Sequence, residues 1–281
     1  MPPLRQGCPA DESLVERRAR AAGSCDAPLP EADIGGVRCL LVEPAAGGAT
    51  GDILYIHGGG YRLGSPVAYL GYARRIADLS GRRIVLPFYP LAPENPFPAA
   101  LHDIVGIYRA LPDPASTVIA GDSAGGGLTA ALCILAARAG QRPAAAIMVS
   151  PMLDLTAQGD SLDRNAERDL LFSKASVLDS ATLYLQGHDA SDPLVSPIQA
   201  DPTDFPPMLV LTGGAEVLLD EALAFVHKLA LADQRVSLHI APAMGHVWPL
   251  MAPDSPEGTA AIAAMADFVK ALKPTVSGVS A

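Results

Sequence analysis

The sequence predicts an α/β fold, with a mostly parallel central sheet and helices on both of its faces. Short apolar runs of strand-like composition recur along the 281 residues, and from residue 52 onward they mostly alternate with segments of helical periodicity. Gly and Pro, with 26 of each in the chain, stand between these runs and mark turns. Alternation of this kind is typical of right-handed crossovers between parallel strands.

Seven segments have the composition of strands. They span residues 37–42, 52–57, 83–88, 117–121, 145–150, 208–212 and 236–240. Apolar residues recur at helical spacing over 69–79 and over 262–272, and residues 128–138 are apolar nearly all round, which predicts a buried helix. Because no repeat or linker divides the chain, we expect residues 1–281 to form a single domain.

Two stretches interrupt this alternation. Residues 154–197 are polar and then patchily apolar, and they contain no strand signal. The chain before residue 37 also lies outside the regular pattern of strands and helices. We therefore expect both stretches to be excursions from the sheet.

The composition excludes several classes of protein. The chain has 20 basic and 30 acidic residues, and its formal charge of −10 argues against nucleic acid or an anionic membrane as the main partner. The cysteines Cys8, Cys25, Cys39 and Cys133 are irregularly spaced, which excludes a disulfide scaffold and does not predict a zinc ribbon. The N-terminus has no apolar signal region, and no apolar run of about eighteen residues predicts a membrane span. We expect a soluble, cytoplasmic protein.

The first candidate for chemistry is Gly121-Asp122-Ser123-Ala124-Gly125, between a predicted strand and the predicted buried helix. A serine at a tight strand-to-helix turn needs glycines on both sides, because the backbone there is strained and packs closely on its neighbours. The helix N-terminus favours the negative charge that develops during acyl transfer. The alternative is a glycine-rich turn without chemistry. A phosphate-binding loop is excluded because the string lacks the Lys-Ser/Thr ending and the G-x-G-x-x-G spacing.

The second candidate is His57-Gly58-Gly59-Gly60, which follows the predicted strand 52–57. Consecutive glycines expose backbone N–H groups with no side chains in the way, which is what an oxyanion hole requires. The position of His57 before the glycines suggests that it braces the loop by hydrogen bonding. The alternative is a loop without a catalytic role.

The third candidate is Gly245-His246, beyond the last predicted strand. A histidine at the carboxyl edge of a parallel sheet can reach a serine that emerges from the same edge. The other histidines lie in patterns that favour packing, solvent exposure or a place in the excursion. They are His57, His102, His188, His227 and His239. Only His246 combines a flanking glycine with the chain order of a serine hydrolase, although a satisfied surface histidine is the alternative.

An orienting acid is expected between the serine and the histidine in the chain. Glu216 comes first in the loop after the predicted strand 208–212, whereas Asp220 already belongs to the next helical pattern. We therefore favour Glu216 over Asp220 as the carboxylate that would fix the imidazole tautomer and stabilise the imidazolium.

Taken together, these strings resemble the hormone-sensitive-lipase branch of the α/β-hydrolases, in its compact bacterial esterase form. The matching strings, in chain order, are H-G-G-G at 57–60, Y-P-L-A-P-E at 89–94, G-D-S-A-G-G at 121–126, D-P-L-V-S-P at 192–197 and G-H at 245–246. The resemblance implies that Ser123 is the nucleophile and His246 the base. It also implies an oxyanion hole formed by the N–H groups of Gly59, Gly60 and Ala124.

The resemblance also implies a fold, and the sequence departs from the family pattern at two positions. It implies the α/β-hydrolase fold with a small helical cap, formed by about residues 1–36 and 156–192. The family usually has D-P-L-x-D at the acid position, and the matching string E-V-L-L-D at 216–220 places Glu216 there. Where the family usually has arginine, position 90 is Pro, so we expect an arginine contact near the site to be missing.

The implied function is that of a carboxylesterase or lactone hydrolase, which cleaves short-chain esters or lactones through an acyl-serine and needs no metal or organic cofactor. Tyr61, Phe172, Tyr184 and Trp248 are candidates for substrate binding, although each is equally explained by packing. An amidase of the arylformamidase kind and a non-catalytic ligand-binding protein are the alternatives. The expected partner is a small ester or lactone. The pattern over 262–272 is compatible with a homodimer or with packing on its own sheet.

Overall fold

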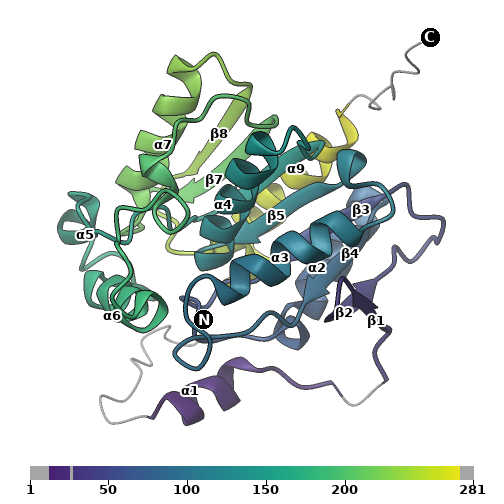
Figure 1. The fold of residues 1–281 in the computed structure, drawn as a ribbon, viewed down its shortest axis with the longest axis horizontal. Coiled ribbons are helices and arrows are strands. Elements are labelled where there is room, and N and C mark those ends of the chain that lie inside the picture. Colours follow the sequence, from purple (N-terminus) through teal and green to yellow (C-terminus); the bar gives the residue numbers. More distant parts are fainter. Residues whose placement is uncertain (1–12, 26–27, 273–281) are drawn as a thin grey trace.

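The computed structural model describes residues 13–25 and 28–272, and its centre is an eight-stranded sheet (Figure 1). The strands are β1 (Glu31–Ile34), β2 (Val37–Val42), β3 (Asp52–Ile56), β4 (Arg83–Pro87), β5 (Val118–Asp122), β6 (Ala145–Val149), β7 (Met208–Gly213) and β8 (Val236–Ala241). Their order is β1-β2-β4-β3-β5-β6-β7-β8. β2 pairs antiparallel with both β1 and β4, and all the other pairs are parallel, so the predicted mostly parallel sheet is confirmed.

The chain before residue 37 is not wholly an excursion, and this expectation is wrong for residues 31–34. These residues form β1, which pairs antiparallel with β2 through a turn at Gly35 and Gly36, both at positive φ. β1 has only four residues, two of them acidic, and none of them is fully buried. Such a strand has no apolar run for a sequence pattern to detect. Residues 1–12 and 26–27 of the expected cap lie outside the described residues.

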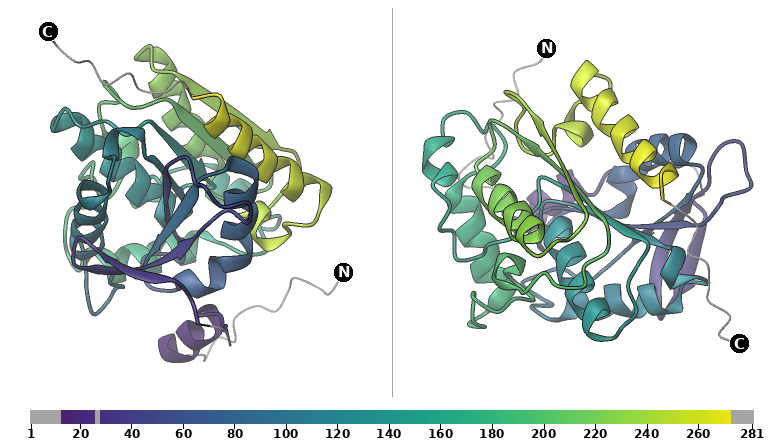
Figure 2. Two further views of the ribbon diagram at one scale, coloured as in Figure 1. Left: turned by 90° about the vertical axis from the view of Figure 1, so that its right-hand side faces the viewer. Right: turned by 90° about the horizontal axis from the view of Figure 1, so that it is seen from above.

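Helices cover both faces of the sheet (Figure 2). They are α1 (Leu14–Ala21), α2 (Leu70–Ser80), α3 (Ala99–Ala110), α4 (Ala124–Arg138), α5 (Ser161–Arg164), α6 (Lys174–Leu185), α7 (Leu219–Leu231), α8 (Trp248–Met251) and α9 (Pro256–Lys270). Along β3, Leu54 and Ile56 pack toward α3 and α4, whereas Ile53 and Tyr55 pack toward α2 and α9. This alternation follows from the two-residue period of a strand, and both faces are apolar because both are covered.

The predicted buried helix at 128–138 is confirmed as α4, which starts earlier, at Ala124. It begins directly after Ser123 and is buried along most of its length. The apolar pattern over 262–272 belongs to α9, whose Ile262, Met265 and Val269 pack into a cluster with α2. Packing within the chain thus accounts for this pattern, and the homodimer stays a prediction.

The expected excursion between β6 and β7 is confirmed as a segment that contains α5 and α6 and no strand. Two contacts link α5 to the start of α7. Ser161 Oγ donates to Val217 O at 2.7 Å, and Arg164 forms an ion pair with Asp220 at 2.5 Å. α1 contacts the rest of the chain through Arg18, which binds both carboxylate oxygens of Glu94. Among the described residues, no helix has the length and apolarity that crossing a bilayer requires.

Candidate active site

The residues singled out from the sequence gather at the carboxyl edge of the sheet. Ser123 follows β5, Glu216 follows β7 and His246 follows β8, while the glycines 58–60 follow β3. Because these strands are parallel, their carboxyl ends lie along one edge, where open α/β sheets bind ligands. Sheet topology therefore brings together residues that are far apart in the chain, such as Ser123 and His246, which are 123 positions apart.

Ser123 occupies a strained turn between β5 and α4. Its φ and ψ are 51° and −121°, a conformation that side chains rarely adopt. The flanking glycines permit this turn, because a Cβ on Gly125 would collide with the carbonyl oxygen of Ile56, and one on Gly121 would collide with Gly125. The turn presents the hydroxyl at the N-terminus of α4, where the helix dipole favours negative charge.

Ser123, His246 and Glu216 form a continuous chain of hydrogen bonds. His246 Nε2 lies 2.9 Å from Ser123 Oγ, and His246 Nδ1 lies 3.2 Å from Glu216 Oε2. All three residues are buried, at 4%, 5% and 0% exposure. When Nδ1 carries the proton, it donates to the carboxylate and leaves Nε2 free to accept the serine proton.

The environment of His246 and Glu216 shifts the pKa of both groups. Burial alone would lower the pKa of His246, but the hydrogen bond and negative charge of Glu216, together with the charges of Asp169 and Asp122, raise it. Burial raises the pKa of Glu216, and hydrogen bonds from His246, Gly213 and Ser150 oppose that rise. The imidazolium form is therefore favoured relative to a histidine that is buried without an acid partner.

Asp220, the alternative acid, is engaged elsewhere. Its carboxylate accepts the backbone N–H of Ser161 at 2.7 Å and pairs with Arg164. It thus joins the start of α7 to α5, whereas Glu216 is the carboxylate that contacts His246.

The glycine loop after β3 is held at several points. The Gly58 N–H donates to Asp122 Oδ1 at 3.1 Å, and His57 Nδ1 lies 2.7 Å from Gly58 O. Tyr89 donates its hydroxyl to His57 O at 2.7 Å. Burial lowers the pKa of His57 to about 4, so its ring is neutral near pH 7 and braces the loop through hydrogen bonds.

Three backbone amides near Ser123 are available for a ligand. Gly59 and Gly60 have φ values of 118° and 61°, and Ala124 is the first residue of α4. Within residues 13–25 and 28–272, none of these three N–H groups donates a hydrogen bond to another protein group. A first-turn amide has no partner inside its own helix.

Asp122 and Ser150 also contact these loops, although the sequence patterns predicted a role for neither of them. Asp122 accepts hydrogen bonds from the hydroxyls of Tyr55 and Tyr69, at 3.1 Å and 3.0 Å. Burial raises the pKa of Asp122 to about 6, although these hydrogen bonds lower it. Ser150 Oγ lies 2.8 Å from Glu216 Oε1. The sequence signal that could have identified both residues is a polar side chain at the carboxyl end of an apolar strand.

The four candidates for substrate binding lie in different surroundings. Phe172 stacks on the His246 ring, with 4.8 Å between centroids and 15° between planes. Tyr61 and Tyr184 stack on each other at 3.9 Å and are nearly inaccessible to solvent. Trp248 is buried in the cluster that includes α2 and α9. Phe172 is therefore the one of the four that contacts His246 through its ring.

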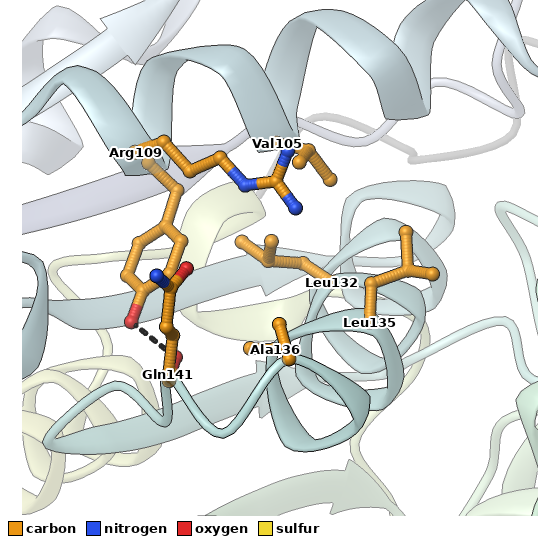
Figure 3. Close-up of a pocket in the computed structure, with 8 residues that line it drawn as sticks. Val105, Arg109, Leu132, Leu135, Ala136 and Gln141 are labelled. Carbon is orange, nitrogen blue, oxygen red and sulfur yellow. Dashed lines mark hydrogen bonds between the residues drawn. The ribbon is translucent and has the colours of Figure 1, made fainter.

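A small cavity lies away from this site, between α3 and the distal half of α4 (Figure 3). Its volume is about 10 Å³, and its lining includes Val105, Arg109, Leu132 and Leu135. Leu135 is twelve residues beyond Ser123, which corresponds to about 18 Å along the helix at about 1.5 Å per residue. The cavity is thus separate from the candidate active site.

Comparison with known proteins agrees with this architecture. Residues 53–250 match a family model described as alpha/beta hydrolase fold. An acetyl-hydrolase of Streptomyces hygroscopicus is 39% identical over 223 residues, which cover 78% of this chain and 75% of that protein. An esterase of Acinetobacter venetianus is 34% identical over 245 residues, which cover 85% of this chain and 80% of that protein.

Solved structures give the same result. The crystal structure of an esterase from the bacterial hormone-sensitive lipase family matches with a TM-score of 0.87 and 35% identity, and the match covers 93% of this chain and 92% of that one. A hormone-sensitive lipase from a metagenome library matches with a TM-score of 0.85 and 35% identity, over 95% and 94% of the two chains. The chain therefore belongs to the α/β hydrolase fold family, in its bacterial hormone-sensitive-lipase branch.

Proposed function

We propose that this protein is a serine hydrolase that cleaves short-chain carboxylic esters through an acyl-serine intermediate. The observation that carries the proposal is the hydrogen-bonded chain from Ser123 Oγ to His246 Nε2, at 2.9 Å, and from His246 Nδ1 to Glu216 Oε2, at 3.2 Å. The relatives named acetyl-hydrolase and esterase support the substrate class, because both align with more than two thirds of this chain.

In the first half of the reaction, Ser123 Oγ attacks the ester carbonyl carbon while His246 Nε2 takes the hydroxyl proton. Glu216 fixes the imidazole tautomer and stabilises the imidazolium. The tetrahedral intermediate then collapses, the C–O bond to the alcohol breaks, and His246 returns the proton to the departing alkoxide. The products of this half are the free alcohol and the acyl-serine.

The N–H groups of Gly59, Gly60 and Ala124 are the donors that we assign to the oxyanion. Their availability supports this role, since none of them is engaged within the described part of the chain. Each oxyanion donor typically contributes about 3 kcal/mol of transition-state stabilisation. Donors that are already positioned contribute most, because they need no reorganisation during the reaction.

In the second half, His246 takes a proton from water, and the hydroxide oxygen attacks the acyl-serine carbonyl. The bond to Ser123 Oγ breaks, Ser123 regains its proton from His246, and the carboxylic acid leaves. A lactone would follow the same path with its alcohol still attached to the acyl group. An amide would differ only in the leaving nitrogen.

We assign the substrate contact nearest to the base to Phe172, because its ring stacks on His246. Tyr61, Tyr184 and Trp248 stay in the proposed substrate-binding set. We also propose that α1 and residues 156–192 act as the cap of a single domain. The contacts that support this are those of Arg18 with Glu94 and of Arg164 with Asp220.

The test is hydrolysis of p-nitrophenyl acetate and butyrate by the wild type and by Ser123→Ala. We expect the variant to keep its fold and to lose at least about 10³-fold in kcat, since the nucleophile cannot be replaced by its neighbours. The turnover of an ester, a lactone and an N-formyl anilide, measured on one preparation of the wild type, ranks the three substrate classes. Turnover by Ser123→Ala close to that of the wild type would refute the proposal.

A further inference from the structure

We infer that Ser150 is a positioning residue. Its single buried hydroxyl fixes the position of Glu216, the acid of the proposed triad, relative to His246, the base. This inference rests on the proposed function and deepens it. Ser150 follows β6, between the strand that leads to Ser123 and the strand that leads to Glu216. It is 0% exposed, so bulk water does not compete for its hydrogen bonds.

The hydroxyl makes two contacts with different loops. Ser150 Oγ donates to Glu216 Oε1 at 2.8 Å, and it accepts the backbone N–H of Val247 at 3.0 Å. A hydroxyl suits this position because it combines one donor with acceptor lone pairs, so it can serve a carboxylate and an amide at once. One atom therefore links the loop after β7 to the loop after β8.

The contact with Val247 controls the backbone that carries the base. Val247 directly follows His246 and has a φ of 48°, a left-handed conformation that is rare for a β-branched residue. Such a conformation persists only when the surroundings hold it. The hydrogen bond from the Val247 N–H to Ser150 is one contact that holds it, so the orientation of the imidazole depends on this hydroxyl.

The contact with Glu216 controls the plane of the carboxylate. Glu216 Oε2 faces His246 Nδ1, while Oε1 accepts from Ser150 Oγ and from the Gly213 N–H. Terminal torsions of glutamate are broad, so a carboxylate needs partners on both oxygens to hold one plane. Without the hydroxyl, the Gly213 amide would be the only donor left on Oε1 among the contacts that the structure describes.

The hydroxyl also affects the charge balance of the site. The acidic groups that act on the pair are Asp169 and Asp122, which favour the charged form of His246, and Glu221, which lies near Glu216. The hydrogen bond from Ser150 stabilises the Glu216 carboxylate, and it matters most while His246 is neutral. Removing it destabilises that neutral-imidazole state, so the pKa of His246 rises and the active base form is reached at a higher pH.

The experiment compares Ser150→Gly and Ser150→Ala with Thr212→Val as a matched control. Glycine removes the hydroxyl and tolerates the φ of 48° at this position, so the fold is not strained further. Thr212 is also 0% exposed and is the last but one residue of the neighbouring strand β7, but its hydroxyl has no partner within the described part of the chain. Folding is checked by circular dichroism and Tm, and kcat and KM for p-nitrophenyl acetate are measured as a function of pH.

We expect both Ser150 variants to lose about 10- to 100-fold in kcat, the range that corresponds to one hydrogen bond to a charged group. KM should change by less than about twofold, and the acidic limb of the kcat/KM profile should move to higher pH. Thr212→Val should leave kcat, KM and the pH profile unchanged.

Folded Ser150→Gly with the kcat and pH profile of the wild type would overturn the inference, and so would an equal loss in Thr212→Val. Ser123→Ala, measured in the same series, separates the two proposals. If Ser123→Ala is inactive and Ser150→Gly is fully active, only the positioning role fails. If Ser123→Ala is active, the proposed function fails.

Discussion

Glu216 and Asp220 show at the scale of single residues how surroundings separate two carboxylates that are four residues apart in the chain. Glu216 is 0% exposed and contacts His246, Ser150 and Gly213. Asp220 has a side chain that is 27% exposed and pairs with Arg164. A buried carboxylate without partners would be costly, so its contacts identify its role more clearly than its residue type does.

Glu216→Gln should cost far more activity than Asp220→Asn. The amide keeps the size of Glu216 but removes the charge that stabilises the imidazolium, and we expect kcat to fall by about 10³- to 10⁴-fold. Asp220→Asn removes a partly exposed ion pair, which contributes at most about 1 kcal/mol to stability, and should leave kcat within about twofold. Steady-state kinetics on p-nitrophenyl acetate checks the ranking. If Asp220→Asn proves the more damaging change, the acid has been wrongly assigned.

At the scale of elements, the turn between β5 and α4 depends on glycines where two segments meet. Gly125 lies in the first turn of α4, and a Cβ there would collide with the carbonyl oxygens of Ile56 and His57 at the end of β3. Gly71 lies in α2, and a Cβ added there would meet no atom within 4 Å. The two helical glycines therefore differ: the first is required by a close approach of two backbones, and the second is not.

Gly125→Ala should destabilise the protein, whereas Gly71→Ala should stabilise it slightly. Overpacking against backbone costs about 1–3 kcal/mol, and the displaced β3 loop should also lower kcat. Replacing an exposed helical glycine by alanine contributes about 0.5–1 kcal/mol to stability. Urea unfolding of the two variants and the wild type measures both changes. If Gly125→Ala and the wild type had the same free energy of unfolding, the collision of the added Cβ with the β3 backbone would be relieved without loss of stability.

At the scale of the whole molecule, the segment between β6 and β7 contacts loops at the carboxyl edge of the sheet. Asp169 accepts the N–H of Phe172 at 3.0 Å and that of Val217 at 3.0 Å, which ties this segment to the loop after Glu216. These two bonds hold Phe172 against the His246 ring. Leu170 and Leu171, its neighbours, are each 50% exposed. The position of Phe172 beside His246 thus depends on contacts between distant parts of the chain.

Phe172→Ala should favour longer acyl chains, with Leu171→Ala as the control from the same loop. Removing the ring opens space over the imidazole, so we expect the ratio of kcat/KM for p-nitrophenyl octanoate to that for the acetate to rise by about tenfold, the effect of one or two added methylenes in an apolar pocket. Leu171→Ala should change this ratio by less than about twofold. A ratio that stays constant in Phe172→Ala would place the acyl group elsewhere.

Several features could be predicted from the sequence because they depend on neighbouring residues. The seven predicted strands coincide with β2–β8 to within one or two residues, since apolar runs and glycine punctuation are local signals. The strand-to-helix context of Ser123 was likewise local. β1 escaped prediction because an edge strand of four residues is stabilised by its pairing with β2 and not by an apolar pattern of its own.

Local patterns along the chain are enough to predict the α/β class, the seven apolar strands and the order of the serine and histidine strings. The folded structure was needed to show that Glu216 and not Asp220 faces His246, that Ser150 joins the two loops and that Phe172 lies on the imidazole. The difference lies in the distance along the chain over which each interaction acts. Periodicity and backbone freedom act between neighbours, whereas these contacts join loops up to 97 positions apart, and the order of strands in the sheet decides which loops meet.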